Sequence, residues 1–188
     1  MRIISGSFKG KKIFEPKDIK TRPLKDLTKE SIFNIINHSK KFRINLENSN
    51  ILDLFSGVGS FGIECLSRGV KKVVFVENYS GVLPILKKNL SNLKSMNNFE
   101  IFEKDVFEYQ TFLNFNKKFD IIFLDPPYRN KSLENLLINI YSSNILNNEG
   151  IIIIHRHKKE EDIVPKNYKI LEKKYYGISK IIFLTIFN

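Results

Sequence analysis

The feature that most constrains the fold is an alternation between short apolar runs and helix-like segments. Seven runs are rich in β-branched and aromatic residues: Asn50 to Phe55, Lys71 to Glu77, Phe99 to Asp105, Phe119 to Asp125, Gly150 to Arg156, Tyr168 to Tyr176 and Lys180 to Phe187. Helix-like segments follow the first four: Ser60 to Arg68, Ser80 to Leu93, Val106 to Phe115 and Ser132 to Leu146. Strands that alternate with helices form a parallel sheet buried on both faces. The pattern therefore predicts an α/β, Rossmann-like domain with a mostly parallel seven-stranded sheet.

The two ends of the chain depart from this alternation. Only a turn around Gly177 separates the last two runs, which predicts a C-terminal antiparallel hairpin. Residues 1–49 are rich in Lys and Arg, open with a candidate small hairpin, RIISGSFKGKKI, and carry a helix predicted at Leu27 to Ser39. We interpret residues 1–49 as a basic N-terminal arm and residues 50–188 as the main domain.

Composition indicates the class of partner. The 188 residues carry 31 Lys and Arg against 20 Asp and Glu, a net charge of +11, which favours an anionic partner such as nucleic acid. The same charge would also be expected of an ordinary protein from an AT-rich genome, whose codons favour Lys, Asn and Ile. The single cysteine excludes an internal disulfide framework. Apolar runs too short to span a bilayer, with no signal-peptide core, predict a cytoplasmic protein that contacts no membrane.

The predicted strand ends gather acidic residues beside a glycine-rich turn. Ligands of open parallel sheets bind beyond the carboxyl ends of the strands, where the strand order reverses. The first strand leads into DLFSGVGSFG, in which Gly57 and Gly59 let the backbone approach a ligand closely. The next three runs end on Glu77, Asp105 and Asp125. Any one of these acids could be an ordinary turn residue, but three in register beside the glycines indicate a binding site.

The charge of this rim favours a cationic nucleoside. The acid Asp53 beside the glycines would repel a phosphate and attract a positive group, which describes S-adenosylmethionine and not a dinucleotide. We expect Asp53 to face the methionine end, Glu77 the ribose hydroxyls and Asp105 the adenine amine. Their neighbours complete the predicted cofactor site: Phe55, Gly57, Gly59, Asn78 and Val106.

The run FDIIFLDPPY suits methyl transfer to an exocyclic amine. Such an amine is a poor nucleophile because its lone pair is delocalised into the base. Asp125 and the Pro126 carbonyl can each accept one N–H and so orient it. Pro126 and Pro127 fix their own φ angles, and Tyr128 offers a face on which a flipped base can stack. The predicted catalytic residues are therefore Asp125, Pro126, Pro127 and Tyr128.

Together these motifs resemble a known family. DLFSGVGSFGIECLSRG followed by FLDPPY is similar to the class I S-adenosylmethionine-dependent amino-methyltransferases. RIISGSFKGKKI, RPLKDLTKESIFNII and YYGISKIIF resemble segments of the RsmD family of 16S ribosomal RNA guanine-N2 methyltransferases. The resemblance covers almost the whole chain. It implies methylation of a guanine N2 amine in 16S rRNA, within a small-subunit particle, by a monomer.

Three places depart from the family pattern. Leu24 replaces a usual Thr, Leu27 replaces a frequent basic residue, and HRHKK after the fifth strand leaves His155 without a role. We expect phosphate contacts from basic residues of the arm and beside the DPPY motif. The predicted RNA-binding residues are Lys9, Lys11, Lys12, Arg22, Lys29 and Arg129.

Two other functions are compatible with parts of the sequence. An adenine-N6 DNA methyltransferase uses a similar motif, but such enzymes usually need a target-recognition insert for which this chain has no spare length. A non-catalytic RNA-binding or assembly protein would not need the intact glycine loop and DPPY. Metal binding is not predicted, because His155 and His157 lack a third ligand cluster. Cys65 is predicted to pack in the core.

Overall fold

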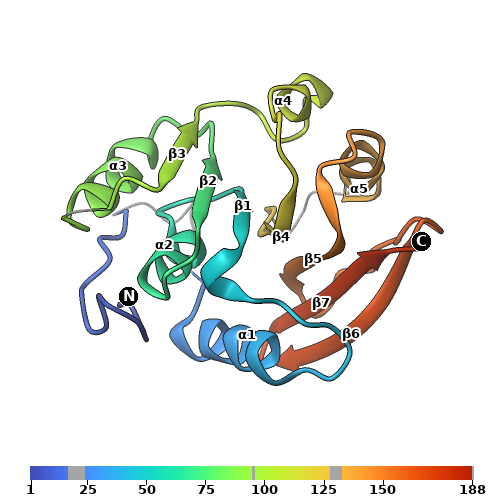
Figure 1. The fold of residues 1–188 in the computed structure, drawn as a ribbon, viewed down its shortest axis with the longest axis horizontal. Coiled ribbons are helices and arrows are strands. Elements are labelled where there is room, and N and C mark those ends of the chain that lie inside the picture. Colours follow the sequence, from blue (N-terminus) through green and yellow to red (C-terminus); the bar gives the residue numbers. More distant parts are fainter. Residues whose placement is uncertain (17–23, 95, 128–132, 188) are drawn as a thin grey trace.

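A seven-stranded sheet forms the centre of the molecule (Figure 1). The structure, a computed structural model, describes residues 1–16, 24–94, 96–127 and 133–187. Within them the strands are β1 (Asn50–Leu54), β2 (Lys72–Val76), β3 (Phe99–Phe102), β4 (Phe119–Leu124), β5 (Leu146–His157), β6 (Tyr168–Tyr176) and β7 (Ser179–Ile186). The helices are α1 (Asp26–His38), α2 (Ser60–Ser67), α3 (Leu83–Ser91), α4 (Tyr109–Leu113) and α5 (Leu133–Ser142), with a short 3-10 turn at Leu46–Asn48.

The sheet is mixed, as the sequence predicts. Its order is β3-β2-β1-β4-β5-β7-β6, and every pair from β3 to β5 is parallel. Strand β7 runs antiparallel to both β5 and β6, which confirms the C-terminal hairpin (Figure 1). The strand order reverses between β1 and β4, so the carboxyl ends of these two neighbours frame the place where a ligand is expected.

Two hydrophobic clusters cover the two faces of the sheet. Successive strand side chains point to opposite faces, so Ile51 joins one cluster and Leu52 the other. The first cluster takes residues from α1, α2 and α3, and the second takes residues from α4 and α5. Burial on both faces is the physical reason that the central runs are continuously apolar.

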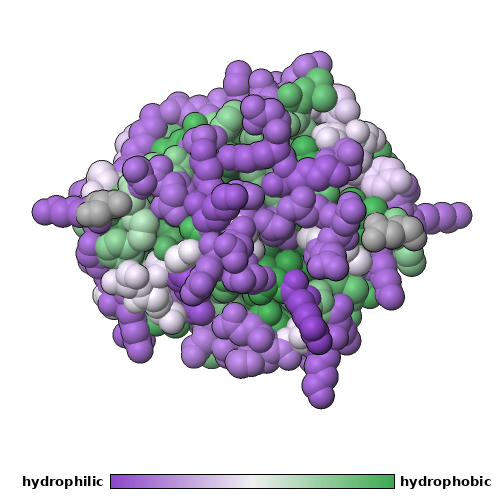
Figure 2. Space-filling model, in the orientation of Figure 1, coloured by the Kyte–Doolittle hydropathy of each residue, from purple (hydrophilic) through white to green (hydrophobic). Residues whose placement is uncertain are grey.

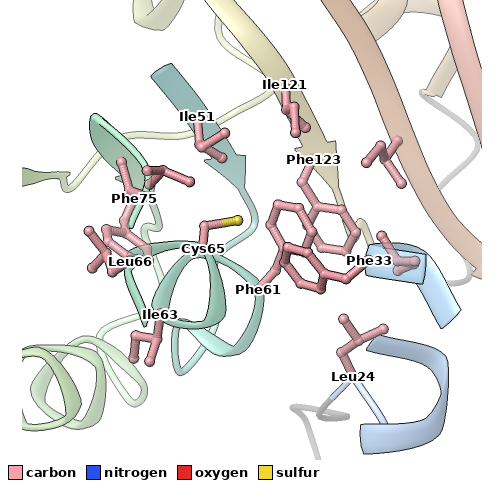
Figure 3. Packing of buried hydrophobic residues seen from close by; sticks show 14 of the residues in the cluster. Leu24, Phe33, Ile51, Phe61, Ile63, Cys65, Leu66, Phe75, Ile121 and Phe123 are labelled. Carbon is pink, nitrogen blue, oxygen red and sulfur yellow. The ribbon is translucent and has the colours of Figure 1, made fainter. Parts of the chain in front are cut away.

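The N-terminal arm is part of the first cluster. Ile3, Ile13 and Phe33 are buried there with residues of the main domain. Figure 3 shows the ring of Phe33 stacked beside that of Phe61, which stacks in turn on Phe123; the centroids are 5.4 and 4.0 Å apart. The candidate hairpin forms, with an antiparallel bridge between Arg2 and Lys12 and backbone hydrogen bonds between its two arms. The arm is therefore packed into the same core as the sheet.

Several element boundaries differ from those predicted. Strand β3 ends at Phe102, because Asp105 Oδ1 accepts the Phe107 N–H in a turn. This turn also delays α4, which is shorter than predicted. Helix α5 ends at Ser142 and β5 already begins at Leu146, because Asn144 adopts a left-handed φ of 51° that stops the helix.

The face in Figure 2 is mainly hydrophilic, with smaller hydrophobic areas between the polar side chains. Among the described residues, no helix combines the length and apolar character needed to cross a bilayer.

Candidate active site

A cavity of about 1180 Å³ lies at the carboxyl ends of the central strands. One wall comes from the ends of β1 and β2 and the turn after β3, and includes Asp53, Glu77 and Asp105. The lining also contains Asp125 and the two prolines after β4, with residues from the end of β5 and the turn after it. Pro16 and Leu24 of the arm also line it. Four acids predicted from separate motifs are thus brought to one cavity.

The turn between β1 and α2 has a backbone that only a glycine-rich segment adopts easily. Gly57 and Gly59 have φ values of 55° and 85°. A Cβ at Gly59 would lie 2.6 Å from the Leu86 side chain, so that side chain would have to shift. Phe55 has a φ of 59°, an uncommon conformation for an aromatic residue. This compact turn exposes backbone N–H groups at the start of α2.

Asp53 is buried beneath this turn. Its Oδ2 accepts the N–H of Gly62 at 2.9 Å, and the residue is 1% exposed. Burial, reinforced by the nearby charges of Asp125 and Glu77, raises the pKa of Asp53 to about 8. The carboxyl is therefore largely protonated near neutral pH, and a cation placed beside it would favour its ionisation.

Glu77 holds the glycine turn from the end of β2. One carboxylate oxygen accepts the Gly57 N–H at 2.8 Å, and the other accepts the N–H groups of Asn78 and Tyr79 at 2.9 and 2.8 Å. A carboxylate has about four acceptor positions, so the oxygen bound to Gly57 retains one for a ligand. Glu77 thus has a loop-bracing role that its place at a strand end did not reveal.

Asp105 lies beside an aromatic pair. It is three residues beyond β3, and its Oδ1 is fixed by the Phe107 N–H at 2.8 Å. The rings of Phe55 and Phe107 stand 5.2 Å apart, and both residues line the cavity with Val106. A carboxylate beside apolar rings is suited to a flat heterocycle that carries an amine.

Asp125 is hydrogen-bonded to a buried histidine of β5. Asp125 Oδ1 lies 2.8 Å from His155 Nδ1, and His155 Nε2 lies 2.9 Å from Ser179 Oγ. Burial opposes the charged form of His155, but the Asp125 carboxylate outweighs burial and raises the pKa of the imidazole. The contact arises because Leu124 pairs with Ile154, so the next residues of the two strands are adjacent.

Arg156, the next residue of β5, is hydrogen-bonded to the backbone of the turn after β4. Arg156 is 1% exposed, and its Nη1 donates to the Pro127 carbonyl at 3.1 Å. Its Nε donates to Asp162 Oδ1 at 2.8 Å. No role was predicted from the sequence for His155, Arg156 or Ser179. These contacts depend on the parallel register of β4 and β5 and on the antiparallel register of β5 and β7, which a single sequence does not specify.

The predicted RNA-binding residues separate into different environments. Lys9, Lys11 and Lys12 are exposed on the arm, with Lys11 Nζ donating to the Asn92 carbonyl at 2.8 Å. Lys29 is fully buried: it donates to the Arg2 carbonyl at 2.9 Å and lies 3.6 Å from Glu64. The prediction for Lys29 is wrong, because its ammonium is buried in the core and bound there by protein groups. Tyr128, Arg129 and Arg22 lie outside the described residues.

The chain is similar to known proteins in both sequence and structure. A family described as conserved hypothetical protein 95 matches residues 1–185. The ribosomal RNA small subunit methyltransferase D of Haemophilus influenzae is 33% identical over 95% of this chain and 90% of its own. The protein of that name from Buchnera aphidicola subsp. Acyrthosiphon pisum is 32% identical over 92% and 86%. The solved structure of Escherichia coli yhhF, 26% identical, has a TM-score of 0.82 over 99% of this chain and 97% of that one.

Proposed function

Because this chain belongs to the conserved hypothetical protein 95 family, the RsmD family, we propose that it methylates the exocyclic N2 amine of a guanine in 16S rRNA. At the coarser level it is an S-adenosylmethionine-dependent rRNA methyltransferase. The observation that carries the guanine-amine proposal is the position of Asp125. It faces the same cavity as Asp53, Glu77 and Asp105, so amine and methyl donor can meet there.

The cavity fits S-adenosylmethionine. Its described wall at the ends of β1, β2 and β3 carries carboxylates and backbone N–H groups, without a Lys or Arg suited to a pyrophosphate. When bound, S-adenosylmethionine supplies an electrophilic methyl group on a positively charged sulfur. Asp53 would stabilise the positive methionine end, Glu77 would accept from ribose, and Asp105 would accept from the adenine amine. Phe55, Val106 and Phe107 would enclose the adenine ring.

The residues that follow β4 would orient the target amine. Asp125 uses Oδ1 for His155, which leaves Oδ2 to accept one N–H of the amine. The Pro126 carbonyl would accept the other, so the lone pair would point across the cavity. Asp125 could then receive the proton that the nitrogen must release when its fourth bond forms. Arg156 holds the Pro127 carbonyl, so the acceptors are set in place before a base arrives.

Asp125→Ala tests this assignment. We expect at least a hundredfold loss of methyl transfer to 16S rRNA with nearly unchanged affinity for S-adenosylmethionine, because Asp125 is assigned to the amine. Asp120→Asn is the matched control: Asp120 lies at the opposite end of β4, where it accepts the Asn50 N–H. Turnover by Asp125→Ala above about a tenth of the wild-type rate would contradict the role.

The target is identified by the product. Purified enzyme is incubated with labelled S-adenosylmethionine and 16S rRNA, and the nucleosides are separated by mass spectrometry. With naked 16S rRNA and small-subunit particles as parallel substrates, we expect N2-methylguanosine in at least one product; N6-methyladenosine, or no modified nucleoside from either substrate, would overturn the guanine assignment. We further propose that the enzyme acts in the cytoplasm as a monomer on a small-subunit particle. Parallel reactions with naked rRNA and particles test the substrate, light scattering of the free protein tests the monomeric state, and fractionation of cells tests the location.

A further inference from the structure

His155 is one of the buried titratable side chains that the proposed reaction does not use. His155 is 4% exposed and lies in β5, yet it is not among the residues that line the cavity. Buried histidines are often satisfied core residues, so burial alone implies no role. His155 is distinguished by its partner, because Asp125 is the acid that the proposed reaction assigns to the target amine.

Both nitrogens of the imidazole have partners on neighbouring strands. Nδ1 lies 2.8 Å from Asp125 at the end of β4, and Nε2 lies 2.9 Å from Ser179 at the start of β7. Strand β5 pairs with both of these strands, so the ring is fixed on either side by the sheet. Asp125 and His155 follow the paired residues Leu124 and Ile154, and Ser179 pairs with His157, so the backbone register brings both partners near the ring.

The serine lets this arrangement persist in either protonation state. In the neutral form with a proton on Nδ1, the ring donates to Asp125 and Ser179 donates to Nε2. In the imidazolium form both nitrogens donate, and Ser179 Oγ accepts. In each case Nδ1–H points to Asp125, so the carboxylate keeps the same orientation when the ring titrates.

We propose that His155 is a positioning residue: it fixes Asp125 Oδ1 through Nδ1–H and thereby presents Oδ2 to the target amine, with Ser179 setting the angle of the ring. This inference rests on the proposed amino-methylation. Without the imidazole, the carboxylate could rotate about its terminal side-chain bond, which has only broad preferred orientations. The Asp125 carboxylate would then be less well oriented toward the target amine, and catalysis would be slower.

The first test compares two substitutions of His155. His155→Leu removes the donor, and we expect kcat to fall on the order of ten- to hundredfold. The KM for RNA and the affinity for S-adenosylmethionine should change less than about threefold, since the residue is assigned to neither binding surface. His155→Asn keeps an N–H near the position of Nδ1 and should recover much of the kcat. Ser179→Ala should give a smaller decrease than His155→Leu.

A matched control separates positioning from stability. Ile154→Val changes the preceding buried residue of β5 and should lower stability slightly without lowering kcat. The thermal midpoint is measured for every variant. A His155→Leu enzyme that folds and keeps wild-type kcat, or a His155→Asn enzyme as slow as His155→Leu, would overturn the proposal. If His155→Leu fails to fold, the Ser179→Ala rate decides: an unchanged kcat with a freely titrating ring contradicts it.

The second test needs no methyl transfer. Charged groups near His155 include the Asp125 carboxylate and the Arg156 guanidinium, and its partner Ser179 is neutral. In the ligand-free protein, NMR titration should show a raised His155 pKa that falls in Asp125→Asn, because the variant lacks the negative charge. An unchanged pKa would disprove the pair itself. An intact pair in a wild-type protein that methylates no RNA would contradict the proposed function and leave the pair established.

Discussion

At the scale of single residues, Asp53 links cofactor binding to a proton. Its folded-state pKa of about 8 lies above the ordinary 3.8, so the folded protein holds a proton that the unfolded chain has released over this range. Asp53 thus stabilises the fold less as pH rises through this window. A cationic ligand favours the ionised carboxylate, so its affinity should rise with pH up to about 8.

Calorimetry can measure this linkage. At about pH 7, binding of S-adenosylmethionine to the wild type should release a fraction of a proton, seen as a heat that depends on the ionisation enthalpy of the buffer. Asp53→Asn keeps an oxygen for the Gly62 N–H but cannot titrate, so it should lack this proton release. Equal proton release by both proteins would show that Asp53 does not ionise on binding.

The site residues that belong to short sequence motifs could be predicted from the sequence. Glu77 and Asp125 end apolar runs and Asp53 lies just before the glycine-rich turn, and these positions alone placed the three acids at one rim. The bracing of Gly57 by Glu77, the burial of Lys29 and the partnership of Asp125 with His155 were not predictable. Each depends on which segments meet across 20 to 31 positions of sequence, which only the packing of elements decides.

At the scale of elements, a buried ion pair ties α1 to α2. Lys29 and Glu64 are both fully buried, and Glu64 also accepts the N–H groups of Ile4 and Ser5. We expect Lys29→Met to destabilise the protein by about 3 kcal/mol, because it leaves Glu64 with less compensating charge. Lys25→Met, one turn earlier and exposed, should cost less than about 0.5 kcal/mol. Chemical denaturation of both variants tests this; equal destabilisation would contradict it.

The exposed face of the arm has a different expected role. Neutralising Lys9, Lys11 and Lys12 should weaken RNA binding and flatten its salt dependence by about 0.7–0.9 log units for each phosphate that the arm no longer neutralises. Cofactor affinity should be unchanged. The control neutralises exposed lysines in or beside the edge strand β6: Lys166, Lys169 and Lys173. Equal salt slopes for the two triple variants would remove the arm from RNA recognition.

Prediction of the elements was limited mainly at their ends. The order and type of the strands followed from apolar runs and the Gly177 turn. The start of β5 was missed because LNNEG reads as a helix end and loop, whereas Asn144 ends α5 and the chain enters the sheet at once. The arm was set apart because its charge pattern differs, although its apolar residues complete the core.

At the scale of the whole molecule, the arm and the sheet should unfold together. Phe33 of α1, Phe61 of α2 and Phe123 of β4 form one ring stack (Figure 3). The Arg68 guanidinium lies 4.1 Å from the Phe33 ring centroid. A core shared in this way predicts a single cooperative transition. Far-ultraviolet circular dichroism and arm-specific hydrogen exchange should report the same free energy. Arm amides that exchange far faster than those of β1 and β4 would show a separate unit.

The buried thiol makes the molecule convenient for mapping its surroundings. Cys65 is the chain's single cysteine, it is fully buried, and burial raises the pKa of its thiol. The thiolate needed for alkylation is therefore scarce and shielded. A cysteine introduced at exposed Lys12 would be the one readily labelled position. A photoactivatable crosslinker attached there would mark the RNA nucleotides beside the arm, and the native cysteine would not have to be replaced first.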